Sequence, residues 1–219
     1  MSEFNNSYVG IRKDLLKFID GQNLKILDVG CATGANGSFL KDQRIASSVI
    51  GVEFDEKMAN VAKSQYDKVY VGDLNEDTFV EKIVSENNNF DFIVLGDILE
   101  HLIDPYNVLK TFAKTLNEEG KVVISVPNIG HLDLFIQIYK NGKWPRNNRG
   151  IFDKTHLSWF TKQNLMELIE FAGLKEIKYS PNYRARDKIN SKFNLFDKVL
   201  KKLKPELYIF QHIIVCKRA

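Results

Sequence analysis

Residues 26–37 have the sequence Ile26-Leu27-Asp28-Val29-Gly30-Cys31-Ala32-Thr33-Gly34-Ala35-Asn36-Gly37, and this stretch decides the fold. It begins as an apolar run, passes through a turn of small residues and continues into a helix-like segment. Small residues allow a ligand to lie close to the backbone, and the N–H groups at the start of the following helix are free to donate to it. The stretch therefore predicts a strand, a ligand-binding turn and a helix.

Outward from this stretch, short runs rich in Ile and Val alternate with helix-like segments along the 219-residue chain. This alternation is typical of βαβ units and of a parallel sheet with helices on both faces. Two late strand-like runs are expected to pair antiparallel at a sheet edge, and residues 128–160, which lack a steady period, are interpreted as an insertion over the carboxyl edge of the sheet. The expected strands cover residues 25–29, 49–54, 68–71, 90–95, 122–126, 174–179 and 208–216, and the expected helices cover residues 36–41, 56–65, 78–87, 105–116, 162–171 and a charged segment within 187–204.

The composition is that of an ordinary globular domain, with 44% hydrophobic and 27% charged residues. The net charge of +3 gives no strong overall field, so no nucleic-acid partner is expected. Cys31 and Cys216 lie far apart in the chain, and residues 1–20 lack the apolar core of a signal peptide, which predicts a reduced, cytoplasmic protein. No run approaches the ~20 apolar residues that cross a bilayer, so no membrane span is expected. The oligomeric state, monomer or homodimer, stays open.

The spacing of the glycines distinguishes two classes of ligand. A dinucleotide site requires G-x-G-x-x-G, in which the second glycine lets a pyrophosphate approach the main chain. Here the glycines stand at positions 30, 34 and 37, with Ala32 between the first two, and this spacing fits a dinucleotide poorly. Asp28 suits a ligand that carries an ammonium group. An NAD-type oxidoreductase is the first alternative.

Polar side chains recur where the next strands end. Glu53 follows the second strand and can accept hydrogen bonds from both hydroxyls of a ribose. Asp73 follows the third strand and can accept from an adenine amino group, while Phe54 and Leu74 can cover the faces of the ring. The fourth strand leads into Gly96-Asp97-Ile98-Leu99-Glu100-His101, at the edge where open α/β sheets bind ligands. The alternative role for the two acidic residues of this segment is to cap the following helix.

Five motifs together resemble the class I S-adenosylmethionine-dependent methyltransferases. They are Leu27-Asp28-Val29-Gly30-Cys31-Ala32-Thr33-Gly34, Gly51-Val52-Glu53, Gly72-Asp73-Leu74, Leu99-Glu100-His101-Leu102 and Gly120-Lys121-Val122-Val123-Ile124-Ser125-Val126-Pro127-Asn128. The resemblance implies an α/β, three-layer, Rossmann-like doubly wound sheet of seven strands, mostly parallel with a reversed C-terminal strand. It also implies S-adenosylmethionine as the cofactor, with S-adenosylhomocysteine as the product. One departure is Ala32, where many members carry glycine. The cofactor-binding residues that follow are Asp28, Gly30, Cys31, Ala32, Gly34, Glu53, Phe54, Asp73, Leu74, Gly96, Asp97, Ile98 and His101.

A second group of candidates lies in and near the insertion. The segment Asp153-Lys154-Thr155-His156 precedes the helix expected over 162–171, whose N-cap is predicted to be Thr161. By resemblance, His156 is the candidate general base and His101 borders the cofactor as a second candidate; a structural role is the alternative for each. The basic and aromatic stretch 139–149 is interpreted either as a contact for an anionic or sugar-bearing substrate or as a solvated loop. Lysines in 198–204 predict a solvated helix face, with contact to a polyanion or a membrane surface as the alternative.

These patterns together predict a single methyltransferase domain over residues 1–219, with 128–160 as a lid that recognises the acceptor. We expect methyl transfer to an oxygen or nitrogen atom of a small molecule, such as a sugar, a glycan precursor or a quinol-like metabolite. No dedicated metal site is expected. Besides the oxidoreductase, the alternatives are a non-catalytic domain that binds S-adenosylmethionine and a nucleic-acid methyltransferase.

Overall fold

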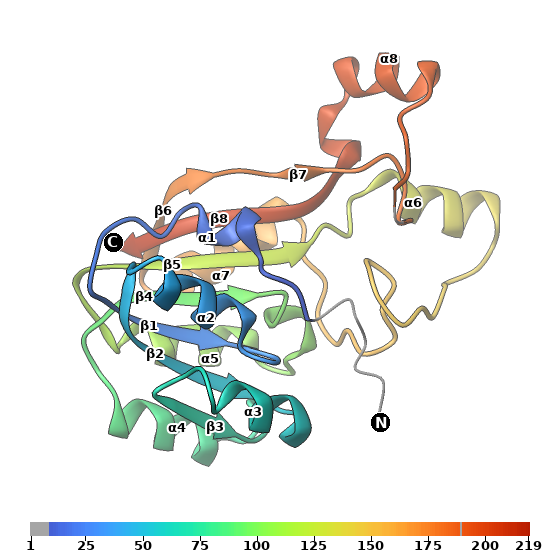
Figure 1. Cartoon of the computed structure of the whole chain (residues 1–219). Coiled ribbons are helices and arrows are strands. Elements are labelled where there is room, and N and C mark those ends of the chain that lie inside the picture. Colours follow the sequence, from blue (N-terminus) through green and yellow to red (C-terminus); the bar gives the residue numbers. More distant parts are fainter. Residues whose placement is uncertain (1–8, 189) are drawn as a thin grey trace.

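The computed structural model of the chain describes residues 9–188 and 190–219. One twisted sheet runs through the molecule, with helices packed on both of its faces (Figure 1). The sheet has the order β3-β2-β1-β4-β5-β8-β6, and the two-residue strand β7 pairs with β8 beside this path. The expected seven strands are therefore all present, and β7 is a short addition. The strands are β1 (Leu24–Val29), β2 (Ala46–Glu53), β3 (Lys68–Val71), β4 (Phe90–Gly96), β5 (Leu116–Pro127), β6 (Leu174–Tyr179), β7 (Asn182–Tyr183) and β8 (Ile209–Arg218).

Strands β1 to β5 pair in parallel, so their carboxyl ends meet at one edge of the sheet. Strand β8 runs antiparallel to both of its neighbours, β5 and β6. The reversed strand predicted from the sequence is confirmed, and it lies inside the sheet because β6 forms the edge. The central parallel strands β1 and β4 are buried along most of their length, as their continuous apolar runs indicate.

Two helical layers complete the fold. On one face α4 (Asp77–Glu86), α5 (Pro105–Ala113) and α7 (Lys162–Phe171) bury an apolar cluster against the sheet. On the other face α1 (Lys13–Leu16), α2 (Ala35–Asp42) and α3 (Glu56–Ala62) bury a second cluster. The N-cap predicted for the 162–171 helix is confirmed, because the backbone N–H of Asn164 donates to Thr161 Oγ1 at 3.3 Å.

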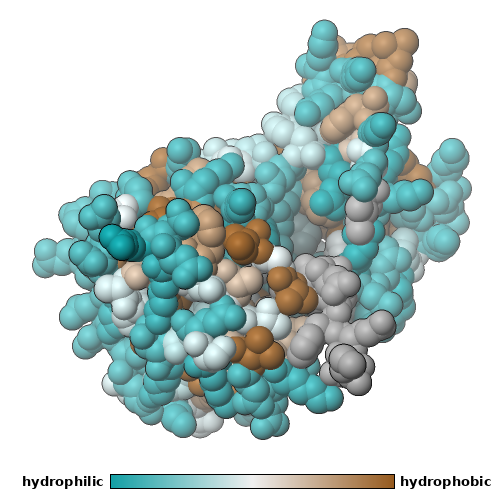
Figure 2. Space-filling model, viewed as in Figure 1, coloured by the Kyte–Doolittle hydropathy of each residue, from teal (hydrophilic) through white to brown (hydrophobic). Residues whose placement is uncertain are grey.

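Two boundaries differ from the expectation. The helix expected to end at residue 116 ends at Ala113, because Leu116 pairs with Phe90 and so begins β5. The charged helix expected within 187–204 is shorter, since α8 spans Leu195–Leu203 and is followed by the 3₁₀ turn η3 (Pro205–Tyr208). Helix α8 stands away from the sheet (Figure 1), and hydrophobic side chains gather at that projecting end of the surface (Figure 2).

The segment 128–160, whose role as an insertion stays a prediction, follows the carboxyl end of β5 and leads to α7. It contains α6 (Leu132–Phe135) and a short π-helix, η2 (Ile136–Lys140). Its inner side chains Ile151 and Phe152 pack against Phe210 of β8 in a small cluster of their own. Within residues 9–188 and 190–219, no helix has the length and apolar content needed to cross a bilayer.

Candidate active site

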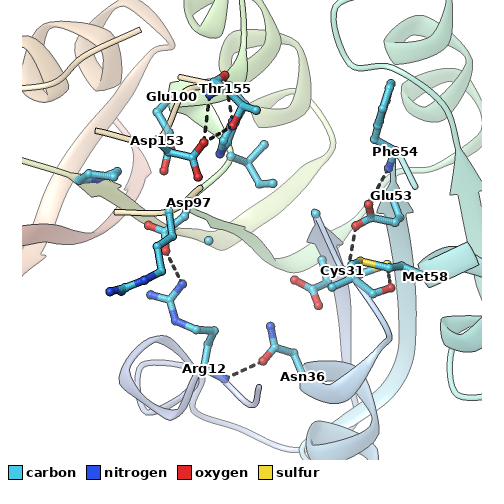
Figure 3. A pocket seen from close by; sticks show the side chains of 18 of the residues that line it. Arg12, Cys31, Asn36, Glu53, Phe54, Met58, Asp97, Glu100, Asp153 and Thr155 are labelled. Atoms are coloured by element: carbon cyan, nitrogen blue, oxygen red, sulfur yellow. Dashed lines mark hydrogen bonds and ion pairs between the residues drawn. The ribbon is translucent and has the colours of Figure 1, made fainter. Parts of the chain in front are cut away.

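A cavity of about 990 Å³ opens at the carboxyl ends of the parallel strands (Figure 3). Its walls come from the turns after β1, β2, β3 and β4, from the segment before α1, from the insertion and from β8. Such an edge is where open α/β sheets hold ligands. All the predicted cofactor-binding residues line this cavity except Gly34.

The turn after β1 depends on Gly30. Its φ of +76° lies in the left-handed region, and a Cβ at this position would come within 2.0 Å of Ile98 Cδ1. The side chain that excludes a larger residue therefore comes from the turn after β4, the strand that pairs with β1. Gly34 has a different role from the predicted one, because it is the N-cap of α2 with φ +87° and packs against Tyr66 and Ala62 outside the cavity.

Glu53 is held at the end of β2 by backbone donors. The N–H of Ala32 donates to Oε2 at 2.8 Å, and the N–H groups of Phe54 and Asp55 donate to Oε1 at 3.0 and 2.9 Å. These three bonds fix the carboxylate between two strand ends (Figure 3). The adjacent Phe54 ring is 72% exposed at the mouth of the cavity, so its predicted role as an adenine cover depends on a bound ligand.

Asp73 follows β3 and is oriented by Asn75, whose backbone N–H and Nδ2 both donate to Oδ1 at 2.9 Å. Asn75 in turn accepts a bond from the backbone N–H of Ile103 at 2.8 Å, which ties the turn to the segment after η1 (Leu99–His101). Leu74 lies beside Asp73 in the wall and packs on the core. The carboxylate of Asp73 is thus preorganised at the same rim of the cavity as Glu53.

Asp28 is buried at the floor. Burial raises its pKa to about 6, and the Tyr66 hydroxyl, which donates to Oδ2 at 2.6 Å, opposes that rise. The same hydroxyl accepts the N–H of Gly37 at 3.0 Å and so links the floor to α2. Cys31, also in the wall, is a free thiol whose pKa is raised by burial, so it stays protonated at neutral pH.

Arg12 was missed by the sequence reasoning, yet it enters the cavity from the segment before α1. Its Nη1 lies 2.6 Å from Asp97 Oδ2, and its Nε lies 3.0 Å from Asp14 Oδ1. Ser125 Oγ and Gln211 Nε2 donate to the other oxygen of Asp97 at 3.0 and 2.5 Å. Arg12 is 85 positions away from Asp97 in the chain, so no local pattern signals this pair.

Asp97 and Glu100 do not cap a helix. The helix that follows, α5, is capped by Asp104, which accepts the N–H of Asn107 at 3.0 Å. Glu100 is 1% exposed, and neither of its carboxylate oxygens has a hydrogen-bond partner, so burial raises its pKa well above the ordinary value. The capping alternative for both residues is wrong.

The two candidate bases meet at the side of the cavity. The rings of His101 and His156 pack edge to face with centroids 4.8 Å apart, and His101 Nδ1 lies 3.2 Å from the carbonyl oxygen of Thr155. Burial, reinforced by the neighbouring His101, lowers the pKa of His156 to about 4, so its imidazole is neutral at pH 7. The backbone N–H groups of Leu157 and Ser158 donate to the carbonyl of Glu100, and these two hydrogen bonds hold the insertion against η1.

Glu100, His101 and His156 also form a group that the chain spacing did not reveal. One ligand atom from each lies within 4.8 Å of the others, which is a donor set that a divalent cation can use. The expectation of no dedicated metal site stays a prediction.

The basic residues of the insertion divide into two groups. Arg149 lines the cavity, together with Arg184 from the segment after β7, while Arg146 is exposed and does not line it. The guanidinium of Arg184 stacks over the Phe210 ring at 3.7 Å. Its pKa is lowered mainly by burial and also by the positive charge of Arg149. Of the two interpretations of residues 139–149, a solvated position therefore fits Arg146, and a contact with the substrate stays a prediction for Arg149.

The sequence pattern of the family described as "Methyltransferase domain" matches residues 5–179, most of the chain. A ubiquinone biosynthesis O-methyltransferase of Coxiella burnetii (strain RSA 493 / Nine Mile phase I) is 30% identical over 117 residues, which cover 52% of this chain and 49% of the relative. One of Bartonella quintana (strain Toulouse) is 28% identical over 123 residues, covering 55% and 48%. The chain spans about half the length of the curated relatives it matches.

Solved structures share the fold. A SAM-dependent methyltransferase from Archaeoglobus fulgidus superposes with a TM-score of 0.68 at 20% identity, over 94% of this chain and 90% of that chain. A possible histamine N-methyltransferase from Thermotoga maritima gives a TM-score of 0.63 at 16% identity, over 97% and 89%. At these identities the likeness shows the common architecture.

Proposed function

Because this chain belongs to the methyltransferase domain family, we propose that it transfers a methyl group from S-adenosylmethionine to a hydroxyl oxygen of a small molecule. The observation that carries the proposal is the neutral His156, which opens onto the same cavity as the carboxylates at the strand ends. Family membership decides against the NAD-type oxidoreductase alternative, in agreement with the glycine spacing.

The strand-end half of the cavity fits the cofactor in charge and shape. Glu53 and Asp73 offer fixed acceptors for the ribose hydroxyls and the adenine amino group. Gly30, with its positive φ, lets the turn after β1 keep its tight backbone course against Ile98. Asp28 and Asp97 supply negative charge for the ammonium group. Arg12 is the cation placed to receive the carboxylate of the same ligand.

When bound, the cofactor supplies a sulfonium methyl group for in-line displacement. Most of the acceleration in such a reaction comes from holding the two reacting atoms in attack geometry, for which effective molarities reach ~10⁵–10⁸ M. A hydroxyl acceptor also has to lose its proton. His156 lines the cavity with a neutral imidazole that can take that proton. A positioned base contributes ~10²–10⁴-fold, and the lowered pKa of His156, which weakens its basicity, favours the lower end of that range.

The insertion 128–160 is the part that we assign to acceptor recognition, within one domain over residues 1–219. It brings His156 and Arg149 to the cavity, and Arg184 joins them from the segment after β7. Trp144 and Trp159 lie edge to face, with ring centroids 5.9 Å apart, and each keeps nearly half of its surface exposed. A rigid loop with aromatic and basic groups suits an aromatic or anionic hydroxyl compound.

A phenolic or quinol-like acceptor is favoured over a sugar or an amine. The curated relatives named above are O-methyltransferases by their names, and an amine acceptor would gain less from a base such as His156 than a hydroxyl would. The weak overall charge of +3 argues against a nucleic acid as acceptor.

The test is transfer of labelled methyl from S-adenosylmethionine to three matched panels: phenols and catechols, sugars, and aromatic amines. Turnover on a hydroxyl panel, with S-adenosylhomocysteine formed in equal amount, supports the proposal. Turnover confined to amines contradicts the assignment of oxygen. Binding of S-adenosylhomocysteine in calorimetry, with no turnover on any panel or on a metabolite extract, would instead support a non-catalytic binding domain.

A further inference from the structure

Helix α8 (Leu195–Leu203) is a preformed element held by its inner face. Its N-terminus carries a capping box, in which the N–H of Asp197 donates to Asn194 Oδ1 at 2.8 Å and Asp197 Oδ2 accepts from the N–H of Asn194 at 3.1 Å. The buried Asp197 also pairs with Arg186 at 2.9 Å and accepts the hydroxyl of Tyr208 at 2.9 Å. The helix is thus fixed on the body in one orientation, and it projects from the sheet (Figure 1).

The outer face of α8 is apolar and open to solvent. Leu195, Phe196, Val199 and Leu203 are 79%, 67%, 54% and 71% exposed. Residues three and four positions apart share one side of a helix, so these four side chains form a single stripe roughly 100° wide. Hydrophobic atoms gather at the projecting end of the surface where this helix lies (Figure 2).

Exposed lysines border that stripe. Lys198 and Lys202 each precede an apolar member of the stripe by one position, so they run along one of its sides, and Lys204 follows the last turn. Lys201 points inward instead, over the Tyr183 ring at 3.9 Å. The only acidic residue within α8 is Asp197, which is buried and paired, whereas just beyond the helix the exposed Glu206 lies 4.0 Å from Lys204. Lys198 and Lys202 therefore carry the positive charge beside the stripe.

We propose that α8 docks the protein on an anionic membrane surface. In this arrangement the apolar stripe lies at the boundary between headgroups and acyl chains, and the bordering lysines reach the lipid phosphates. A helix with Leu and Phe on one face and lysines on its flanks is the composition that lies in such an interface. Lysine stems can lie along the apolar region while their ammonium groups stay in the headgroup layer.

The lysine border favours a membrane over a protein partner. Lysine is depleted in protein interfaces relative to the rest of a protein surface, because each ammonium group loses water on burial. At a membrane the same groups stay hydrated and meet anionic lipid. The inference depends on α8 alone and stands whether or not the proposed acceptor class is correct.

The test is flotation of the full chain with vesicles of phosphatidylcholine alone or mixed with phosphatidylglycerol, at low and high salt. The wild type is expected to bind the mixed vesicles about tenfold or more tightly than the neutral ones, and less tightly at high salt. Phe196→Ser with Leu203→Ser is expected to lower the partition coefficient about tenfold or more. Lys198→Gln with Lys202→Gln is expected to remove most of the preference for anionic lipid.

Ile103→Ser is the matched control, because Ile103 is 74% exposed but lies after η1, away from α8. It should bind vesicles as the wild type does, and all variants should keep the melting temperature, since the replaced side chains face solvent. The proposal is overturned if the Phe196 and Leu203 pair floats like the wild type, or if neutral vesicles bind equally well. If the wild type binds no vesicles but sediments as a dimer, and Phe196→Ser with Leu203→Ser abolishes that dimer, the stripe is an interface between two copies of the chain. Retention of RNA that depends only on the lysines would make it a nucleic-acid contact.

Discussion

The two sides of the cavity are built in different ways. On the strand-end side, Glu53 and Asp73 are oriented by residues of their own turns, and even the longer link from Glu53 to Ala32 joins two neighbouring strands. On the insertion side, His101 contacts Thr155 from 54 positions away, and the N–H of Ile151 donates to Asp187 from 36 positions away. Local geometry therefore fixes Glu53 and Asp73 on the cofactor side, where the Arg12–Asp97 pair is the long-range exception, whereas long-range packing fixes the acceptor side. The two sides should respond separately to mutation.

The substitution His156→Gln is expected to give the largest difference between its effect on turnover and its effect on cofactor binding. Turnover should fall about 10²–10⁴-fold, the contribution of a positioned base, while the dissociation constant of S-adenosylhomocysteine changes less than about twofold. Calorimetry and methyl-transfer rates measure the two quantities on the same preparation. Equal loss of binding and turnover, or a large drop in melting temperature, would show that His156 is structural. His101 would then be the next candidate base.

Gly30→Val should weaken binding of S-adenosylhomocysteine about a hundredfold or more. The new side chain collides with Ile98 and takes a positive φ that a branched residue resists, at a cost of about 1–3 kcal/mol for the backbone alone. Gly142→Val is the matched control, since Gly142 has φ +62° with nothing within 4 Å of its added Cβ. Both variants should lose stability from backbone strain, but only Gly30→Val should lose binding. Normal binding by Gly30→Val would place the site elsewhere.

Glu53→Ala should weaken binding of S-adenosylhomocysteine at least about tenfold, because hydrogen bonds to a charged acceptor are worth ~1.5–3 kcal/mol. Glu56→Ala, on the exposed start of α3, is the comparison and should bind normally. Turnover at saturating cofactor should be nearly unchanged in both. Unaltered calorimetry for Glu53→Ala would remove this residue from the ribose assignment.

Arg149→Ala should raise the KM for an anionic acceptor about tenfold and leave cofactor affinity intact, because this guanidinium lines the cavity. Arg146→Ala should change neither, since its side chain lies outside. Comparing Arg149→Ala with Arg146→Ala tests the acceptor side, because both substitutions remove an arginine from the same segment and only one of the two lines the cavity. Equal effects of the two substitutions would indicate a general electrostatic contribution rather than a contact.

The smallest expected effect is the pH dependence of turnover. A histidine whose pKa is lowered to about 4 keeps its neutral form as the pH falls, so at saturating cofactor His156 should change the rate by less than about 10% between pH 8 and pH 5.5. Saturation removes the contribution of Asp28, which has a pKa raised to about 6. An ordinary histidine would instead lower the rate severalfold across the same range. If the rate of the wild type falls severalfold from pH 8 to pH 5.5 and that of His156→Gln does not, the lowered pKa of His156 is contradicted.

The sequence predicts the cofactor side well because its signals are local. The βαβ alternation and the small-residue turn predict β1 and the turn after it. The carboxylates of Glu53 and Asp73 are predicted in the same way, because each follows the next strand in that alternation. Gly34 is the predicted residue that does not line the cavity, because the sequence does not distinguish a left-handed glycine that starts a helix from one that admits a ligand. Only the structure shows that its neighbours are Tyr66 and Ala62.

The acceptor side was only partly predictable. The D-x-T-H segment indicates His156, but Arg184 has no motif at all. On the cofactor side, in the same way, nothing near Arg12 indicates that it meets Asp97. The difference between Arg146 and Arg149 depends on how the insertion folds over β8, which composition does not specify. The ring pair of His101 and His156 likewise depends on contacts between segments far apart in the chain.

The place of β8 between β5 and β6 also has a consequence for how the chain acquires its structure. Strand β6 joins the sheet only through β8, whereas β1 to β5 can assemble from neighbouring βαβ units. Until β8 arrives, β5 presents an unpaired row of N–H and C=O groups, and such an edge can capture a strand of another molecule. Refolding yield should therefore fall as protein concentration rises, and a substitution that delays the docking of β8 should promote aggregation without weakening the finished fold.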